Sequence, residues 1–294
     1  LTSIIKNNHL QKGYNPVYWC LDCASALSEA EVEYADKESL SIDVRFVVVS
    51  ESAAIALFPG VKAGQGAISI PIWTTTPWTL PANQAVALNP SLDYVLVECD
   101  GKECFIVAKD LLESVMQRYG VNEFKVLGTA QGEALVGLKL KHPLFDKQVP
   151  VVLGEHVTVD SGTGAVHTAP AHGPDDFAIG KAYQLPLENP VGDDGCYIST
   201  TPLFAKIHVR KADPEVIKVL EENNALIVQS KLTHSYPHCW RHKSPLIYRA
   251  TPQWFISMEQ GGLRAEALAA IPGVEWVPDW GQSRIHGMIA NRPD

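Results

Sequence analysis

The chain has 294 residues, of which 46% are hydrophobic and 19% charged, and its formal net charge is −9 at pH 7. This composition is typical of a soluble globular protein, and no apolar run approaches the roughly 20 residues that a membrane-spanning helix needs. The negative charge gives no global attraction to nucleic acid, and six cysteines are too few for a disulfide scaffold in a chain of this length. We therefore expect a reduced, cytoplasmic protein with no membrane partner.

Two pairs of metal-ligating residues stand far apart in the chain. Cys20 and Cys23 form a Cys-x-x-Cys pair after an extended run, and Cys239 and His242 repeat that spacing near the other end. In a zinc knuckle, a tight turn at this spacing aims two ligands at one ion. Two buried free thiols are the alternative for the first pair. We expect the four residues to form one structural Zn²⁺ site that brings the ends of an inserted domain together.

Between these pairs, short apolar runs separated by turn residues predict a series of strands. The predicted strands are residues 43–50, 67–75, 93–98, 103–108, 124–129, 134–140, 149–153 and 225–231. Helices are predicted at 51–58, 110–119 and 175–182, and a further helix from Asp213, with this aspartate as its cap. The pattern favours a mainly β fold with peripheral helices (α+β), arranged as a closed or nearly closed β-barrel.

One stretch combines a strand end with a cluster of hydroxyl groups. Residues 72–83 read Ile-Trp-Thr-Thr-Thr-Pro-Trp-Thr-Leu-Pro-Ala-Asn, and Pro77 ends the strand pattern. Because threonine favours strands, a strand running into a turn explains the threonines without any function. Polar groups where a strand emerges into a loop are also what a rigid scaffold presents to a ligand. On these residues alone, both interpretations stay open.

A second informative stretch spans residues 160–177. Residues 162–164 read Gly-Thr-Gly, which allows the backbone a sharp bend or a close approach to a ligand. A short apolar strand then leads to His167, and a turn rich in proline and glycine leads to Asp175 and Asp176. Aspartate at this position also stabilises a helix N-terminus, so a purely structural role is the alternative. The chain contains no nucleophile elbow and no Walker-type glycine loop.

Together, these stretches resemble a known family. Residues 73–83, the segment 162–167 and the run from 170 to 176 are closely similar to the editing domain, connective peptide 1, of bacterial isoleucyl-tRNA synthetases. The likeness covers essentially the whole chain, including 19–23, 236–242 and 250–255. The sister enzymes for valine and leucine typically continue Thr-Thr-Arg-Pro, whereas residues 75–78 here read Thr-Thr-Pro-Trp, as in the isoleucine branch. The family's two adenylate-forming signatures are absent from these 294 residues, so we expect a piece of a longer protein that does not activate isoleucine.

The resemblance also implies a domain organisation and partners. An incoming segment with the Cys-x-x-Cys knuckle (1–42) precedes a β-barrel editing domain (43–232). An outgoing segment with Cys-x-x-His (233–294) leads back towards the Rossmann catalytic core of a class I synthetase. The implied partners are tRNA, through the 3′ end of an isoleucine acceptor that carries valine, and the catalytic core of the same parent chain. We expect a monomer.

The activity that the resemblance implies is hydrolysis of valine wrongly attached to isoleucine tRNA, with valyl adenylate as a second substrate. Asp176 would hold the α-ammonium of the amino acid, His167 would limit its size, and Trp73 would wall the pocket. The other implied site residues would hydrogen-bond the ester, the ribose or the attacking water: Thr74, Thr75, Thr76, Thr79 and Asn83. The hydrolysis itself needs no cofactor. The alternatives are a non-catalytic module that binds the tRNA acceptor end and a free-standing aminoacyl-tRNA deacylase.

Overall fold

The computed structural model describes residues 1–61, 66–101 and 103–292. The chain divides into two compact units, one formed by Leu1–Asn15 with Thr251–Asp294 and the other by Pro16–Ala250. The threonine stretch, the glycine stretch and the four metal-ligating residues all belong to the second unit. The three-part division at residues 42 and 232 stays a prediction.

The smaller unit contains the chain's two ends. Its helices are α1 (Thr2–Lys6), α6 (Leu263–Ala270) and α7 (Trp280–Ala290), with the 3₁₀ turns η6 (Gln260–Gly262) and η7 (Ile271–Gly273). Arg264 on α6 donates to the carbonyl of Ile289 on α7 at 2.6 Å, which ties the two helices together. Among the helices that the structure describes, none is long and apolar enough to cross a membrane.

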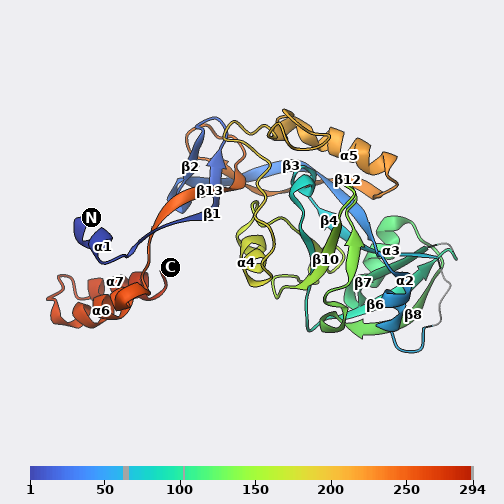
Figure 1. The fold of residues 1–294 in the computed structure, drawn as a ribbon, viewed down its shortest axis with the longest axis horizontal. Helices are drawn as coiled ribbons and strands as arrows, with labels where there is room; N and C mark the ends of the chain where they lie inside the picture. Colours follow the sequence, from blue (N-terminus) through green and yellow to red (C-terminus); the bar gives the residue numbers. More distant parts are fainter. Residues whose placement is uncertain (62–65, 102, 293–294) are drawn as a thin grey trace. The chain divides into compact units, whose positions relative to one another are not determined.

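The strands of the described residues form three sheets (Figure 1). The largest has the strand order β12-β3-β4-β7-β6-β8, with β3 (Val32–Val47), β4 (Ala67–Thr74), β6 (Asp93–Cys99), β7 (Glu103–Ala108), β8 (Phe124–Gln131) and β12 (Leu226–Cys239). The second has the order β11-β5-β10-β9, with β5 (Ala85–Leu88), β9 (Lys139–Lys141), β10 (Gln148–Leu153) and β11 (Ala165–Thr168). The third joins β13 (Ile247–Ile256), β1 (Leu10–Cys20) and β2 (Ser25–Leu27).

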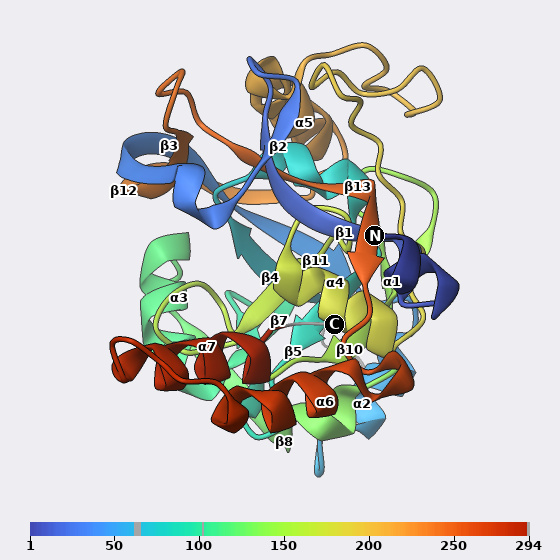
Figure 2. The ribbon, with the colours of Figure 1, turned by 90° about the vertical axis from the view of Figure 1, so that its left-hand side faces the viewer.

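Helices lie at the periphery of these sheets. They are α2 (Glu51–Ala56), α3 (Leu112–Tyr119), α4 (Pro174–Ala182) and α5 (Ala212–Glu222), with the short 3₁₀ helices η1 (Glu29–Glu31), η2 (Pro77–Ala82), η3 (Lys109–Leu111), η4 (Gly132–Leu135) and η5 (Val209–Lys211). Helix α4 packs beside β11, directly after the turn that follows this strand (Figure 2). The prediction of a mainly β fold with peripheral helices is confirmed.

The expectation of a closed or nearly closed barrel needs correction. In the part of the chain that the structure describes, the strands form three sheets with open edges, and an isolated bridge from Val48 to Leu140 links the two larger ones. The reason lies in β3, which changes partner along its length. It pairs with β12 from Val32 to Val44 and with β4 from Ile42 to Val47, so its first half forms a two-stranded arm with β12 rather than part of a barrel wall.

Several element boundaries also differ from the prediction. Strand β3 begins before residue 43, and β12 continues past residue 231. The prediction missed these extensions because the residues of the arm are mostly polar and show no regular alternation of apolar side chains. The predicted strand at 134–140 is instead η4 followed by the short β9. Helix α5 begins before Asp213, with Lys211 at its cap position. The carboxylate of Asp213 instead accepts a hydrogen bond from the amide of Trp78 at 3.0 Å.

The core sits against the central strands of the largest sheet. Alternate residues of β3 and β4 are fully or almost fully buried there: Ile42, Val44, Phe46, Ile68, Ile70 and Ile72. Burying each such side chain contributes about 1.5–3 kcal/mol. Strand β4 is buried on both faces over most of its length, so the threonine stretch emerges directly from the core.

Candidate functional site

The threonine stretch leaves β4 and turns at once into a 3₁₀ helix. Strand β4 ends at Thr74, and η2 begins at Pro77, whose fixed φ suits the first helical position. All six residues of η2 are buried, and the hydrogen bond from the Trp78 amide to Asp213 anchors its first turn. Burial and anchoring together hold the threonine side chains of this segment in place.

Three of the threonine hydroxyls form a hydrogen-bonded chain. The hydroxyl oxygens of Thr74 and Thr76 lie 3.2 Å apart, and those of Thr76 and Thr79 lie 3.4 Å apart. The Thr79 hydroxyl donates to the carbonyl of Thr76 at 2.8 Å, and the Thr76 amide donates to the Thr74 hydroxyl at 3.1 Å. The prediction that these hydroxyls gather at the end of the strand therefore agrees with their placement.

His167 joins the end of this chain. Strand β11 pairs with β5 and delivers the imidazole Nε2 to within 3.0 Å of the Thr79 hydroxyl. Because that hydroxyl gives its single proton to the Thr76 carbonyl, Nε2 must be the donor and Nδ1 an unprotonated acceptor. Nδ1 is buried and has no hydrogen-bond partner among the described residues. Burial, and secondarily nearby His172, lowers the pKa of His167 to about 4, so the ring is neutral at pH 7.

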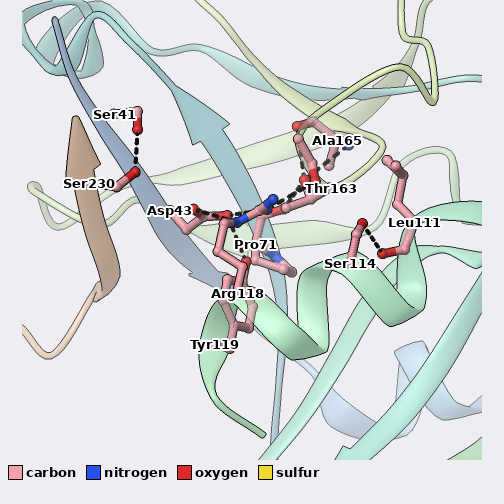
Figure 3. Close-up of polar contacts among 11 residues, drawn as sticks. Ser41, Asp43, Pro71, Leu111, Ser114, Arg118, Tyr119, Thr163, Ala165 and Ser230 are labelled. Carbon is pink, nitrogen blue, oxygen red and sulfur yellow. Dashed lines mark hydrogen bonds and ion pairs between the residues drawn. The ribbon is translucent and has the colours of Figure 1, made fainter. Parts of the chain in front are cut away.

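The Gly-Thr-Gly segment forms a sharply bent loop. Gly162 and Gly164 have φ of +81° and +78°, a conformation that favours glycine, and a Cβ on Gly164 would lie 2.2 Å from the Cβ of Ala108. Between them, buried Thr163 donates its hydroxyl to the carbonyl of Pro71 on β4 at 2.7 Å (Figure 3). The loop is thus fastened against the strand that carries the threonines.

A pocket of about 250 Å³ lies between these two segments. One side is formed by Trp73, Thr74 and Thr75, and the other by the loop and strand residues 161–166. His156 and Thr158 complete the lining. Thr74 therefore belongs both to the pocket and to the hydrogen-bonded chain that leads to His167.

Asp176 lies in the first turn of α4 and is tied to the segment after β11. Its carboxylate accepts a hydrogen bond from the amide of Ala169 at 2.8 Å, two residues beyond His167. Burial raises the pKa of Asp176 to about 6, against the effect of that amide, while neighbouring Asp175 is exposed. A half-buried carboxylate with this environment is still ionised at pH 7 and can bind a cation.

Asn83 makes its side-chain hydrogen bond within a turn and not within the chain of threonine hydroxyls. It is fully buried, and its side-chain amide donates to the carbonyl of Ala85 at 2.8 Å, where it fixes the turn from η2 into β5. Of the predicted site residues, only Trp73, Thr74 and Thr75 are among the described residues that line the pocket. The others are Thr76, Thr79, Asn83, His167 and Asp176, none of which is in that lining. Sequence reasoning missed the lining residues His156 and Thr158, which lie in an irregular segment without a recognisable pattern.

The two Cys/His pairs come together as predicted. One donor atom from each of Cys20, Cys23, Cys239 and His242 lies within 4.8 Å of the others. The Sγ of Cys23 is 3.9 Å from that of Cys239 and 3.1 Å from Nδ1 of His242. Tetrahedral zinc with Zn–S bonds of about 2.3 Å places its sulfur ligands about 3.8 Å apart, so the spacing fits. These residues could hold a metal ion.

The surroundings of Cys239 favour a thiolate, whereas burial and the neighbouring cysteines raise the pKa of the Cys23 thiol to about 12. The Cys23 amide donates to Sγ of Cys20 at 3.3 Å. Burial alone raises the pKa of the Cys239 thiol, but the backbone amides of His242 and Arg241 outweigh burial and bring the pKa down to about 7. Amides aimed at sulfur in this way stabilise the deprotonated form that binds metal.

Comparison with known proteins adds a family context to this geometry. The family model described as tRNA synthetases class I (I, L, M and V) matches residues 1–294. The isoleucine–tRNA ligase of Methylococcus capsulatus is 56% identical over 100% of this chain, and that of Shewanella sediminis is 57% identical. The chain spans 32% of the length of these relatives.

Solved structures are similar in fold. The structure described as GlLeuRS-CP1 has a TM-score of 0.51 at 17% identity and covers 65% of this chain and 98% of its own. The editing domain of the P. knowlesi cytosolic leucyl-tRNA synthetase has a TM-score of 0.51 at 13% identity and covers 66% of this chain and 97% of its own. The fold is that of synthetase editing domains.

Proposed function

Because the chain belongs to the class I tRNA synthetase family of the isoleucine, leucine, methionine and valine enzymes, we propose that it is the hydrolytic editing domain of an isoleucyl-tRNA synthetase. Its reaction is the release of valine from isoleucine tRNA that carries it in error. The observation that carries the proposal is a pocket between Thr74 and the glycine loop, together with the chain of hydroxyls that leads from Thr74 away to His167.

The need for such a reaction follows from the similarity of the two amino acids. Valine lacks one methylene of isoleucine, and a binding pocket can reject it by only about 1–3 kcal/mol, a figure for which this enzyme family is itself the standard example. A second pocket that admits valine and excludes the larger isoleucine then removes the error by hydrolysis.

The reaction at the site is attack of water on the ester carbonyl that joins valine to the terminal ribose. The C–O bond to the ribose breaks, and the ribose oxygen takes up a proton as tRNA leaves. A threonine hydroxyl is a poor base, so the hydroxyls of Thr74, Thr75 and Thr76 orient the ester and the water rather than remove a proton. In this scheme the neighbouring ribose hydroxyl assists the proton transfer.

The charged and aromatic groups hold the amino acid. Asp176 accepts charge-assisted hydrogen bonds from the α-ammonium of valine, since a fixed carboxylate both anchors and orients a cation. His167, held neutral by burial and fixed by Thr79, limits the size of the side chain that enters. Trp73 lines the pocket and would contact the terminal adenosine or the amino acid.

The cluster of three cysteines and one histidine supports a structural zinc in this proposal. Zn²⁺ prefers a tetrahedral set of cysteine and histidine ligands, and all four positions would be taken by the protein. Such an ion would clip together segments that are 219 residues apart and would take no part in the hydrolysis.

Release of radiolabelled valine from valyl-tRNA by the 294-residue chain tests the proposal. We expect hydrolysis well above the spontaneous rate and strongly reduced hydrolysis by an Asp176→Ala variant that retains its fold. A chain that binds the valyl-tRNA but leaves the ester intact would contradict the proposal and point to a non-catalytic module for the acceptor end.

A further inference from the structure

An ion pair lies behind the glycine loop, outside the pocket itself. Arg118 on α3 binds Asp43 on β3 through two parallel hydrogen bonds, from Nε to Oδ2 at 3.1 Å and from Nη2 to Oδ1 at 2.8 Å. The side chains of Asp43 and Arg118 are only 2% and 27% exposed. Burial raises the pKa of Asp43, and the contact with Arg118 opposes this effect. The pair is therefore well shielded from water and held in one geometry.

The same guanidinium also holds the loop. Nη2 of Arg118 carries two N–H groups, and besides its bond to Asp43 it donates to the carbonyl oxygen of Gly162 at 2.9 Å. The Tyr119 hydroxyl donates to Asp43 Oδ1 at 2.9 Å and restrains the carboxylate further. One planar fork thus connects a carboxylate on the sheet to a backbone carbonyl of the loop.

The position of Asp43 makes this connection relevant to the pocket. Asp43 on β3 is directly opposite Trp73 in the β3–β4 ladder, so its backbone is paired with the strand that forms the threonine side of the pocket. The loop forms the other side, and its two glycines with positive φ allow other conformations. Two contacts hold the loop in a single conformation: the bond from Arg118 to Gly162 at one end, and the bond from Thr163 to Pro71 at the centre.

We propose that Arg118, held by Asp43, is a positioning residue for the deacylation reaction. It fixes the Gly162 carbonyl and thereby sets the separation between the glycine loop and residues 73–75 in which the valyl ester is bound. The inference rests on the proposed function for its catalytic consequence. Lysine cannot replace arginine here, because an ammonium lacks the planar fork that serves Asp43 and the loop together.

Three variants of the 294-residue chain test the role. Arg118→Lys keeps a positive charge beside Asp43 but removes the fork. The double variant Asp43→Asn, Arg118→Gln removes both charges and leaves no buried ion without a partner, in case the single change impairs folding. The matched control is Arg45→Gln, which breaks a neighbouring ion pair on β3, in which Arg45 binds Glu103 at 2.7 Å instead of the glycine loop.

Two readouts separate positioning from mere stability. The first is amide hydrogen exchange of Ala108 and Ala165, whose N–H groups donate to the Thr163 carbonyl and hydroxyl and so report on the loop. The second is steady-state deacylation of valyl-tRNA, with kcat and KM determined separately. In both Arg118 variants we expect faster exchange at these amides and a kcat lower by about 100-fold with a smaller change in KM, since a displacement of about 1 Å in a catalytic site has effects of this size.

The outcomes are distinct. Folded variants that keep the exchange rates or the kcat of the Arg45→Gln control would overturn the positioning role. A wild-type chain that releases no valine refutes the proposed function instead, while the exchange rates of Ala108 and Ala165 still decide whether Arg118 fixes the loop.

Discussion

Burial shifts the two ionisable side chains of the site in opposite directions. It raises the pKa of Asp176 to about 6 and lowers that of His167 to about 4, in each case by disfavouring the charged form. At pH 7 the site therefore combines one carboxylate with a neutral imidazole. This is the charge state that suits a substrate whose amino group is cationic and whose ester is neutral.

Deacylation should depend on the ionisation of Asp176. Below pH 6 the carboxylate becomes protonated and loses its attraction for the ammonium, so we expect kcat/KM for valyl-tRNA to fall about tenfold per pH unit. Asp176→Asn should be slow at every pH and show no such decline. An unchanged acid limb in the variant would assign the titration to another group.

The same carboxylate should reduce stability once it is ionised. Because its pKa is higher in the folded state than in the unfolded chain, the folded state binds more protons between about pH 4 and 6, and stability is lost as the pH rises through this range. We expect Asp176→Asn to raise the melting temperature at pH 8 and to have little effect at pH 4. An equal change in melting temperature at pH 4 and pH 8 would show that burial of the ionised carboxylate does not destabilise the fold.

His167 should control the size of the accepted amino acid. His167→Ala removes the ring that contacts the Thr79 hydroxyl, and we expect the variant to hydrolyse isoleucyl-tRNA, whereas the wild type should spare it. One methylene changes discrimination by about 10- to 200-fold, so the gain should lie in this range. Continued rejection of isoleucyl-tRNA by a folded variant would exclude the histidine from size selection.

At the scale of single elements, the glycine loop depends on close packing as well as on its φ angles. Gly164→Ala adds a Cβ that meets Ala108, whereas Gly137, with a similar φ of +82°, has nothing within 4 Å of an added Cβ. We expect Gly137→Ala to lower the free energy of unfolding by about 1–2 kcal/mol from backbone strain alone. Gly164→Ala should lower it by about 1–3 kcal/mol more through overpacking and should also impair deacylation. Equal unfolding curves for the two variants would contradict the close approach of loop and strand.

The elements that could be predicted from sequence are those with a local signal. Strands β4, β6 and β7 coincide with apolar runs in the sequence. Asp100-Gly101 between β6 and β7 predicts their antiparallel pairing, and Gly120, with φ of +69°, caps the end of α3. The arm of β3 and β12 could not be predicted, because its polar residues gain their strand pairing from each other rather than from a buried face. Within the site, Arg118 had no local signal, since its partners Asp43 and Gly162 are 75 and 44 residues away.

At the scale of the whole molecule, metal should contribute to folding of the larger unit. Removing zinc with a chelator should lower the unfolding midpoint, because the ion binds a site that the unfolded chain does not preform. Purified wild-type chain should contain one zinc, and Cys239→Ser should lose it, while the control Cys196→Ser, outside the cluster, should keep it. Less than one zinc per chain with reduced thiols would indicate plain buried cysteines.

Ligand spacing explains why this long-range contact was predictable. Cys-x-x-Cys and Cys-x-x-His each specify half of a tetrahedral site, so two such halves imply their own proximity without any knowledge of the path between them. The closure of the sheets carried no equivalent signal, since a count of strands does not determine which edges pair. The open edges of the sheets and the change of partner along β3 therefore could not be predicted from the sequence.

Single-turnover hydrolysis of valyl- and isoleucyl-tRNA, both on isoleucine tRNA and assayed side by side with the 294-residue chain, tests the central claim most directly. The account predicts rapid release of valine, with isoleucine released about 10- to 200-fold more slowly. Equal rates for the two esters, or no release of valine above the spontaneous rate, would contradict it.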